Sequence, residues 1–243
     1  MINWAKDLFP IHRSITGNGV RDTIAYLQKI NPEIVEKEFR TGETVFDWEI
    51  PKEWVIRDAW VKHIATNQYY ALLQENNLHV LGYSQPINKI ISKERLLKHI
   101  YTQPDQPHTI PYVTSYYSER WGFCMSENTK NHLPEGDYQV FIDAEHIEGK
   151  LRLGEAIVNG NTSDEIMFST YICHPSMANN ETSGPVVVSA LIQYLRENYP
   201  KPKLTYRFLF VPETIGAIAY LSNEHKKLKS NTLAGFVISC VGD

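Results

Sequence analysis

The first fifty residues contain a helical hydrophobic repeat followed by a strand-like segment. Val20, Ile24 and Leu27 recur at the spacing that places side chains on one face of an α-helix. An Asn-Pro step that ends at Pro32 interrupts the repeat and predicts the end of this helix. The apolar stretch that follows, residues 35–39, predicts the first strand.

The hydrophobic pattern changes at about residue 45. From there to residue 111, short aromatic-rich stretches alternate with clusters of turn-forming residues, which is typical of short strands. We therefore expect an inserted, mostly β module at residues 46–111. It would interrupt a larger domain made of residues 1–45 and 112–243.

A β-hairpin is predicted after this module. Residues 138–147 and 150–158 both have strand-like patterns, and Glu148-Gly149 between them suits a tight turn. We expect the two segments to pair in the antiparallel direction.

The C-terminal part of the chain alternates strand-like and helical segments. The predicted order is strand 166–173, helix 185–196, strand 206–211, helix 215–222 and strand 234–241. Ser183 is placed to cap the first of these helices, with Pro185 in its first turn, where proline is tolerated. Strands that alternate with helices predict a parallel sheet covered on both faces, and hence an α/β fold.

Composition and charge argue against several classes of protein. The chain has 24 basic and 28 acidic residues, without the basic stripe that nucleic-acid binding requires. No apolar run approaches the length of a membrane span, and charges interrupt the N-terminus where a secretory signal would be apolar. Cys173 and Cys240 lie at the ends of apolar strand-like runs, where a free cysteine behaves as a small hydrophobic residue. We therefore expect a cytoplasmic protein without membrane or nucleic-acid partners.

Each of the three C-terminal strands is followed by a residue that can bind metal or transfer protons. His174 follows the first strand, Glu213 the second and Asp243 the third. Because parallel strands end at one edge of a sheet, one cation could be surrounded by an imidazole and two carboxylates. Zinc suits this mixture of ligands best.

A hydrolytic zinc site also needs a carboxylate that accepts a proton from water, and Glu213 is the candidate. The polar stretch between His174 and the next helix is expected to form a loop. Its backbone amides and the helix N-terminus could face the same pocket.

Several segments resemble known proteins. Three segments carry the first resemblance: EAIVNGNTSDEIMFSTYICHPSMANNETSGPVVVSALIQYL, RFLFVPETIGAIAYL and GFVISCVGD. They are similar to zinc aminopeptidases that have an α/β/α sandwich and two co-catalytic metals. Three further stretches carry a narrower resemblance: LFPIHRSITGNGVRDT, SYYSERWGFCM and CHPSMANN. They resemble a bacterial aminopeptidase-like family whose genes often lie near polysaccharide-biosynthesis genes. Together these segments span nearly the whole chain. The resemblance implies a three-layer α/β/α sandwich that binds one or two zinc ions.

The resemblance also implies roles for individual residues. His174 matches the first zinc-binding histidine, and Glu213 matches the general base. Asn180 stands where the aminopeptidases have a bridging aspartate, and Asp243 matches an aspartate ligand more loosely. An asparagine cannot bridge two cations as a carboxylate does.

Two further positions depart from the wider aminopeptidase pattern. Ser176 replaces an aspartate, and Thr214 replaces a second, metal-binding glutamate. The resemblance implies in addition that the chain is truncated: a further histidine ligand, more strands and a C-terminal winged-helix domain are expected beyond residue 243.

Structural interpretations of the same residues remain open. His174 could be a hydrogen-bonded structural residue, Glu213 a helix cap, and Asp243 part of a loop. Asn180 could hold a turn through its side chain. Cys173 beside His174 could suggest a thiol nucleophile, but successive strand residues point to opposite faces.

Two further features of the sequence, an Arg-Ser pair near the N-terminus and an aromatic cluster, can be explained by structural roles. Arg13 and Ser14 could anchor the first helix or bind an anionic substrate group. An aromatic cluster is expected to pack in the core or between domains; its members are Tyr116, Tyr117, Trp121 and Phe123.

The leading hypothesis is a zinc-dependent hydrolase of aminopeptidase type that cleaves a peptide or a small aminoacyl amide. A second hypothesis is a degenerate peptidase fold that serves as a binding or assembly module in cell-surface polysaccharide biosynthesis. A third is an amidohydrolase that acts on a modified sugar. The chain could also form a homo-oligomer.

Overall fold

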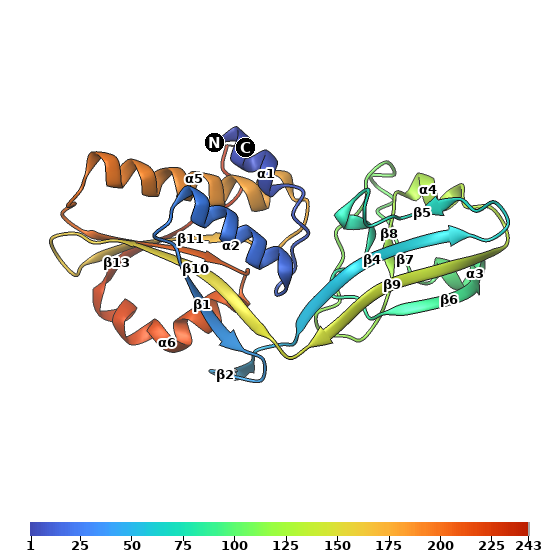
Figure 1. Cartoon of the computed structure of the whole chain (residues 1–243), viewed down its shortest axis with the longest axis horizontal. Coiled ribbons are helices and arrows are strands. Elements are labelled where there is room, and N and C mark those ends of the chain that lie inside the picture. Colours follow the sequence, from blue (N-terminus) through green and yellow to red (C-terminus); the bar gives the residue numbers. More distant parts are fainter. Residues whose placement is uncertain (243) are drawn as a thin grey trace. The chain divides into compact units, whose positions relative to one another are not determined.

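The computed structural model describes residues 1–242, which divide into two compact units (Figure 1). Unit 1 contains Met1–Glu53 and the chain from Glu148 onward, and unit 2 contains Trp54–Ile147. The second unit is therefore inserted into the first.

Unit 1 contains the helices and strands expected of an α/β domain. Its helices are α1 (Ile2–Leu8), α2 (Asn18–Ile30), α5 (Ala178–Asn198) and α6 (Ile215–Asn231). Its strands are β1 (Val35–Arg40), β2 (Thr44–Val45), β3 (Trp48–Glu49), β10 (Lys150–Val158), β11 (Glu165–Tyr171), β12 (Thr205–Val211) and β13 (Thr232–Val237).

The central sheet of unit 1 has the strand order β1-β10-β12-β11-β13. β11 runs parallel to both β12 and β13, whereas β10 runs antiparallel to β1 and β12. The connection through α5 leads from β11 to β12, and the connection through α6 leads back past β11 to β13. The two connections cross the sheet in opposite directions along the strand order. Because such crossovers are right-handed, their helices α5 and α6 lie on opposite faces of the sheet.

Helices α1, α2 and α5 lie on one face of this sheet and α6 lies on the other (Figure 1). A hydrophobic core fills the space between the first face and its helices. It includes Leu8, Ile24 and Leu27 from α1 and α2, Val188 and Ile192 from α5, and Phe208 and Phe210 from β12. The predicted three-layer α/β/α sandwich is confirmed, with a mixed rather than purely parallel sheet.

Unit 2 is built mainly from strands. They are β4 (Glu53–His63), β5 (Tyr69–Tyr70), β6 (Ile87–Ser92), β7 (Ile100–Tyr101), β8 (Phe123–Cys124) and β9 (Asp137–Ile147). Three short helical segments accompany them: η1 (Asn77–His79), α3 (Lys93–Leu97) and α4 (Glu127–Asn131). Its main sheet has the order β5-β4-β9-β6.

The predicted hairpin at Glu148-Gly149 is wrong. β9 and β10 do extend on either side of this dipeptide, but β9 belongs to the sheet of unit 2 and β10 to the sheet of unit 1. Both edges of β10 are occupied, because β1 and β12 flank it. Glu148-Gly149 therefore connects the two units.

The boundaries of the inserted unit also differ from the expected 46–111. The hairpin of β2 and β3 stays in unit 1 although it lies within the aromatic-rich stretch. At the other end, β8 and β9 extend the inserted unit to Ile147. The compositional change marks neither boundary, since strand pairing decides it.

The C-terminal elements differ from the prediction in length. α6 continues to Asn231 rather than ending at residue 222, and β13 ends at Val237 rather than residue 241. Within the described residues, no helix is long and apolar enough to cross a membrane.

Candidate functional site

The carboxyl ends of β11 and β12 bring His174 and Glu213 together. The last residues of the two parallel strands, Tyr171 and Val211, lie side by side in the register. His174 follows three residues after the first and Glu213 two residues after the second. As a result, His174 Nε2 lies 3.4 Å from Glu213 Oε2.

The other ring nitrogen of His174 contacts a residue that the sequence analysis did not select. Its Nδ1 pairs with Glu181 Oε1, and Glu181 Oε2 accepts a hydrogen bond of 2.8 Å from the backbone N–H of Cys173. The Glu181 side chain is completely buried, whereas 45% of the Glu213 side chain is exposed. The imidazole therefore lies between one buried and one accessible carboxylate.

Glu181 was missed because its segment has the composition of a loop. α5 begins at Ala178 rather than at residue 185, so Glu181 lies in its first turn and Pro185 lies inside the helix. The predicted cap at Ser183 is wrong: its Oγ donates to Asn179 O (2.7 Å) within the helix. Short polar side chains that bond to carbonyls one turn back satisfy themselves inside a helix.

Gly184 allows α5 to pack against the strand ends. A Cβ atom at this position would lie 2.2 Å from Thr170 Oγ1 and 2.3 Å from Ile238 O. Both distances are far below van der Waals contact, and the second partner is backbone. The absence of a side chain at Gly184 therefore allows α5 to pack close to the strand ends, and this packing sets the position of Glu181.

Arg13 reaches the site from the segment between α1 and α2. Its Nε donates to His174 O (2.9 Å) and its Nη1 donates to Leu8 O (3.0 Å), while 1% of the residue is exposed. Its buried Nη2 has no hydrogen-bond partner among the described residues. Burial lowers the pKa of the guanidinium, and the negative charge of Glu181 opposes that shift.

Cys173 is a buried hydrogen-bond acceptor. Its Sγ accepts the backbone N–H of Glu213 at 3.1 Å and lies 3.8 Å from His174 Nδ1. Burial, followed by the charge of Glu181, raises the pKa of this thiol well above its usual value. A thiol that stays protonated is a poor nucleophile, and Glu181 occupies the ring nitrogen next to it.

Asn180 contacts the segment that follows β13. Its Nδ2 lies 3.8 Å from Cys240 Sγ, and its backbone oxygen accepts from Ser239 Oγ at 3.4 Å. The buried Oδ1 of Asn180 has no hydrogen-bond partner within residues 1–242. Asp243 lies outside the described residues.

Backbone strain accompanies the two strand ends. Ser176, two residues after His174, has φ +46°, and Thr214, immediately after Glu213, has φ +60°. A positive φ is uncommon for serine and an outlier for a β-branched residue. Such strain costs on the order of 1–3 kcal/mol and clusters at functional sites.

The donor groups of this cluster are suited to zinc. His174, Cys173 and Glu181 present their ligand atoms within 4.8 Å of one another. The contacts already described, however, commit Glu181 to His174, and burial raises the pKa of the Cys173 thiol. The ring nitrogen of His174 that faces Glu213 then supplies one of the four ligands that zinc takes in tetrahedral sites, and the accessible Glu213 carboxylate lies beside it. The unpartnered Oδ1 of Asn180 is a further oxygen donor.

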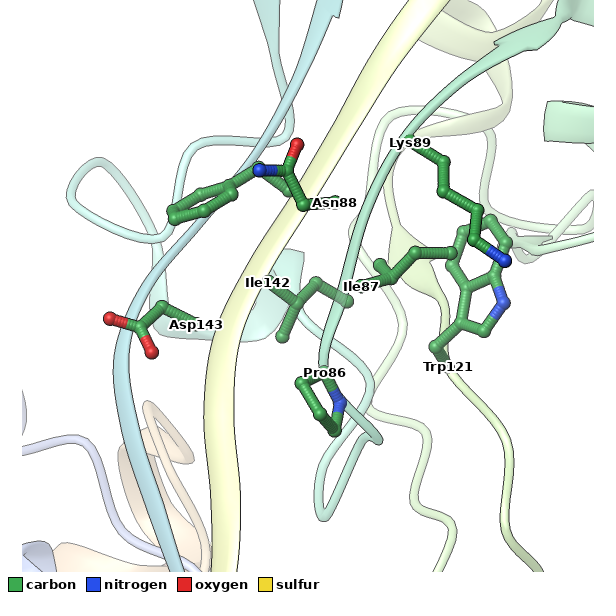
Figure 2. Close-up of a pocket in the computed structure, with 8 residues that line it drawn as sticks. Pro86, Ile87, Asn88, Lys89, Trp121, Ile142 and Asp143 are labelled. Atoms are coloured by element: carbon green, nitrogen blue, oxygen red, sulfur yellow. The ribbon is translucent and has the colours of Figure 1, made fainter.

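A separate open pocket of about 490 Å³ lies in unit 2 (Figure 2). It is lined by Pro86, Ile87, Asn88, Lys89, Trp121, Phe141, Ile142 and Asp143. Trp121 stacks on His99 with ring centroids 3.7 Å apart, which holds the indole in place. This pocket contains none of the predicted site residues.

The aromatic residues predicted to pack have different fates. Phe123 is fully buried, Tyr116 contacts Tyr83 edge to face, and Trp121 lines the pocket. Tyr117 is 88% exposed, so the packing expected for it is wrong.

Comparison with known proteins identifies relatives along the whole chain. The family described as "Domain of unknown function (DUF4910)" matches residues 2–243. A protein of Clostridium acetobutylicum named "Putative polysaccharide biosynthesis protein with aminopeptidase-like domain" is 44% identical over 241 residues, which are 99% of this chain and 54% of that protein. The chain therefore spans about half the length of this curated relative.

Solved structures show the same fold. A crystal structure described as that of a putative peptidase from Clostridium acetobutylicum matches with a TM-score of 0.95 and 44% identity, over 99% of this chain and 56% of that one. A zinc aminopeptidase from Bacillus subtilis matches with a TM-score of 0.64 at 9% identity, over 99% of this chain and 67% of that one. The chain thus has a fold similar to that of the zinc aminopeptidases.

Proposed function

Since this chain belongs to the DUF4910 family and has the zinc-aminopeptidase fold, we propose that it acts as a zinc-dependent hydrolase of aminopeptidase type. The reaction is hydrolysis of an N-terminal aminoacyl or related amide bond by an activated water. Peptides and small aminoacyl amides are the substrate class. We also propose that the protein acts in the cytoplasm and that it can form a homo-oligomer.

One observation carries this proposal. A buried carboxylate, Glu181, holds one ring nitrogen of His174, and the other ring nitrogen faces the accessible carboxylate of Glu213 at 3.4 Å. Histidines that bind metal almost always donate their second N–H to a carboxylate or carbonyl group in this way. This pairing supports the proposal of a carboxylate–histidine–zinc centre.

The residues divide the chemistry between them. Zinc, when bound, activates water and polarises the amide carbonyl. Glu213 accepts the proton of the attacking water and can return it to the leaving amine, because its carboxylate is half exposed and can reach a substrate. His174 binds the metal, with Asn180 and Asp243 as further ligands.

A second candidate function rests on the chain's departures from the aminopeptidase pattern. Asn180 and Thr214 stand where the resemblance expects carboxylates, and in the Cys173–His174–Glu181 group within residues 1–242 the Glu181 carboxylate is already paired with His174. A degenerate peptidase fold used for binding or assembly in polysaccharide biosynthesis is consistent with these observations. An amidohydrolase that acts on a modified sugar would keep the metal and change only the substrate.

Metal content distinguishes the two functions. We would purify the 243-residue chain without a chelator or an affinity tag and measure bound metals by elemental mass spectrometry. His174→Ala is the test variant, and His132→Ala, which removes an exposed histidine of unit 2, is the matched control. One or two zinc ions in the parent and the control, lost from His174→Ala, support the hydrolase. The same metal content in all three proteins would remove His174 as a ligand.

A further inference from the structure

The two nitrogens of the His174 ring have different neighbours, so the position of the ring proton decides what the side chain can do. Nδ1 pairs with Glu181 and Nε2 faces Glu213. A neutral imidazole carries one N–H and one lone pair, and only the lone pair can bind a metal ion. Whichever residue fixes the proton on Nδ1 directs the lone pair of Nε2 toward Glu213.

Glu181 has the contacts needed to fix that proton. Its Oε2 accepts the Cys173 N–H at 2.8 Å, which leaves Oε1 as the oxygen that meets Nδ1. Because Oε2 already acts as an acceptor, we assign Oε1 as the acceptor and Nδ1 as the donor in this pair. The position of Glu181 in the first turn of α5 adds the favourable field of a helix N-terminus.

Arg13 completes the arrangement from a distant part of the sequence. Its Nε donates to the backbone oxygen of His174 at 2.9 Å, and its guanidinium is near enough to completely buried Glu181 for their opposite charges to attract, without a direct ion pair between the two side chains. A buried carboxylate is stable only when such a partner and hydrogen bonds compensate for its lost hydration. Arg13 therefore supports both the charge of Glu181 and the backbone position of His174.

We propose that Glu181 and Arg13 form a positioning pair, which keeps the His174 ring proton on Nδ1 and presents the Nε2 lone pair to the side of Glu213. The assignment of Nε2 as a metal ligand rests on the proposed function; the position of the proton does not. The pair also makes the segment between α1 and α2 part of the site.

Glu181→Gln tests the proposal with little change in shape. The amide has one acceptor and one donor end. The Cys173 N–H requires the oxygen, so the NH₂ group turns toward His174 Nδ1 and the ring proton moves to Nε2. Two-bond ¹H–¹⁵N correlation spectra of the metal-free protein distinguish the two tautomers directly. We expect the Nδ1–H form in the parent and the Nε2–H form in the variant.

Zinc affinity provides the second measurement, by competition with a chromophoric chelator. We expect Glu181→Gln to weaken zinc binding about 10–100-fold, the usual effect of losing a residue that orients a ligand. Arg13→Met should weaken it in the same direction. Glu181→Asp, which restores a carboxylate, should recover part of the affinity and the Nδ1–H tautomer. Glu197→Gln, on the exposed surface of the same helix, is the matched control and should leave both the tautomer and the zinc affinity unchanged.

The outcomes separate this proposal from the proposed function. An unchanged His174 tautomer in a folded Glu181→Gln protein overturns the positioning pair, whatever the metal content. A tautomer that switches in a protein that never binds zinc supports the pair and refutes the hydrolase. Amide fingerprint spectra of each variant establish that it has folded, and if Glu181→Gln does not fold, Glu181→Asp and Arg13→Met provide the same two measurements.

Discussion

Two buried polar clusters occur at opposite ends of the central sheet of unit 1, and they differ in how completely their groups are paired. The cluster near the start of β11 centres on Arg207. Its Nε and Nη2 donate to Glu165 at 2.8–3.1 Å, and its Nη1 donates to the Tyr220 hydroxyl at 2.9 Å and to Glu155. None of these four side chains has a buried polar atom without a partner. This cluster is closed.

The cluster at the carboxyl ends of the strands is open. Glu213 is half exposed, Arg13 Nη2 and Asn180 Oδ1 lack hydrogen-bond partners within the described residues, and Thr214 has a strained backbone. Both clusters contain buried carboxylates opposite an arginine, so charge alone does not distinguish them. Incomplete pairing at the end of the sheet where ligands bind in α/β folds is the feature that indicates chemistry.

Removing Arg207 should produce the largest loss of stability. Arg207→Met leaves Glu155 and Glu165 buried without their shared counter-charge, so the free energy of unfolding should fall by about 3–5 kcal/mol. Urea denaturation measures the change. Arg57→Met is the control, because Arg57 pairs with Asp143 and Glu145 at the surface, and its loss should cost about 1 kcal/mol or less. Equal losses in the two variants would contradict a structural role for the closed cluster.

Glu213→Gln should affect turnover rather than stability. Removal of the proton acceptor should reduce the turnover of an aminoacyl-amide substrate about 10²–10⁴-fold, while the urea midpoint and bound zinc stay close to the parent values. Glu197→Gln, on the exposed surface of α5, is the matched control and should retain full turnover. If Glu213→Gln retained turnover, Glu213 would not be the base.

The sequence predicts the strands and their ends better than the side chains that gather between them. Apolar runs ending near Tyr171 and Val211 are local features, and parallel pairing then places His174 beside Glu213. Glu181 could not be selected in the same way, because its polar neighbours are typical of a loop and only packing shows that they continue α5. The long-range partner of His174, Arg13, has no signal in periodicity.

Strand partners were equally out of reach of local pattern. The alternation in β9 and β10 predicts two strands, but nothing within them indicates that β10 pairs with β1 and β12 while β9 pairs with β4 and β6. A dipeptide suited to a tight turn therefore gave the wrong pairing. Insertion of one unit into another is a non-local property, and strand alternation is a local one.

Gly184→Ala should disturb the open cluster and leave the closed one intact. The new methyl group would collide with Thr170 Oγ1 and the Ile238 carbonyl, so α5 must shift away from the strand ends. We expect a loss of about 1–3 kcal/mol in the free energy of unfolding, as for overpacked cores, together with weaker zinc binding. Gly235→Ala is the control, since its Cβ atom would lie 3.5 Å from Met167 Cε, an ordinary contact. Comparable losses in both variants would show that α5 tolerates displacement.

The closed cluster should also contribute to the acid sensitivity of folding. Burial raises the pKa of Glu155, but the Tyr220 hydroxyl, Lys37 and Arg207 together lower it below its usual value. A carboxyl group with a lowered folded-state pKa stabilises the fold above its unfolded pKa of about 4.3, and this stabilisation is lost as the pH falls through the folded-state pKa. The free energy of unfolding should therefore be level near neutral pH with respect to Glu155 and decline below about pH 4. Glu155→Gln, followed by urea denaturation across this range, should show a shallower decline than the parent, because the variant has no proton to bind at this position. Parallel declines in the two proteins would mean that acid acts elsewhere, and the closed cluster would then stabilise the sheet by geometry rather than by its charge.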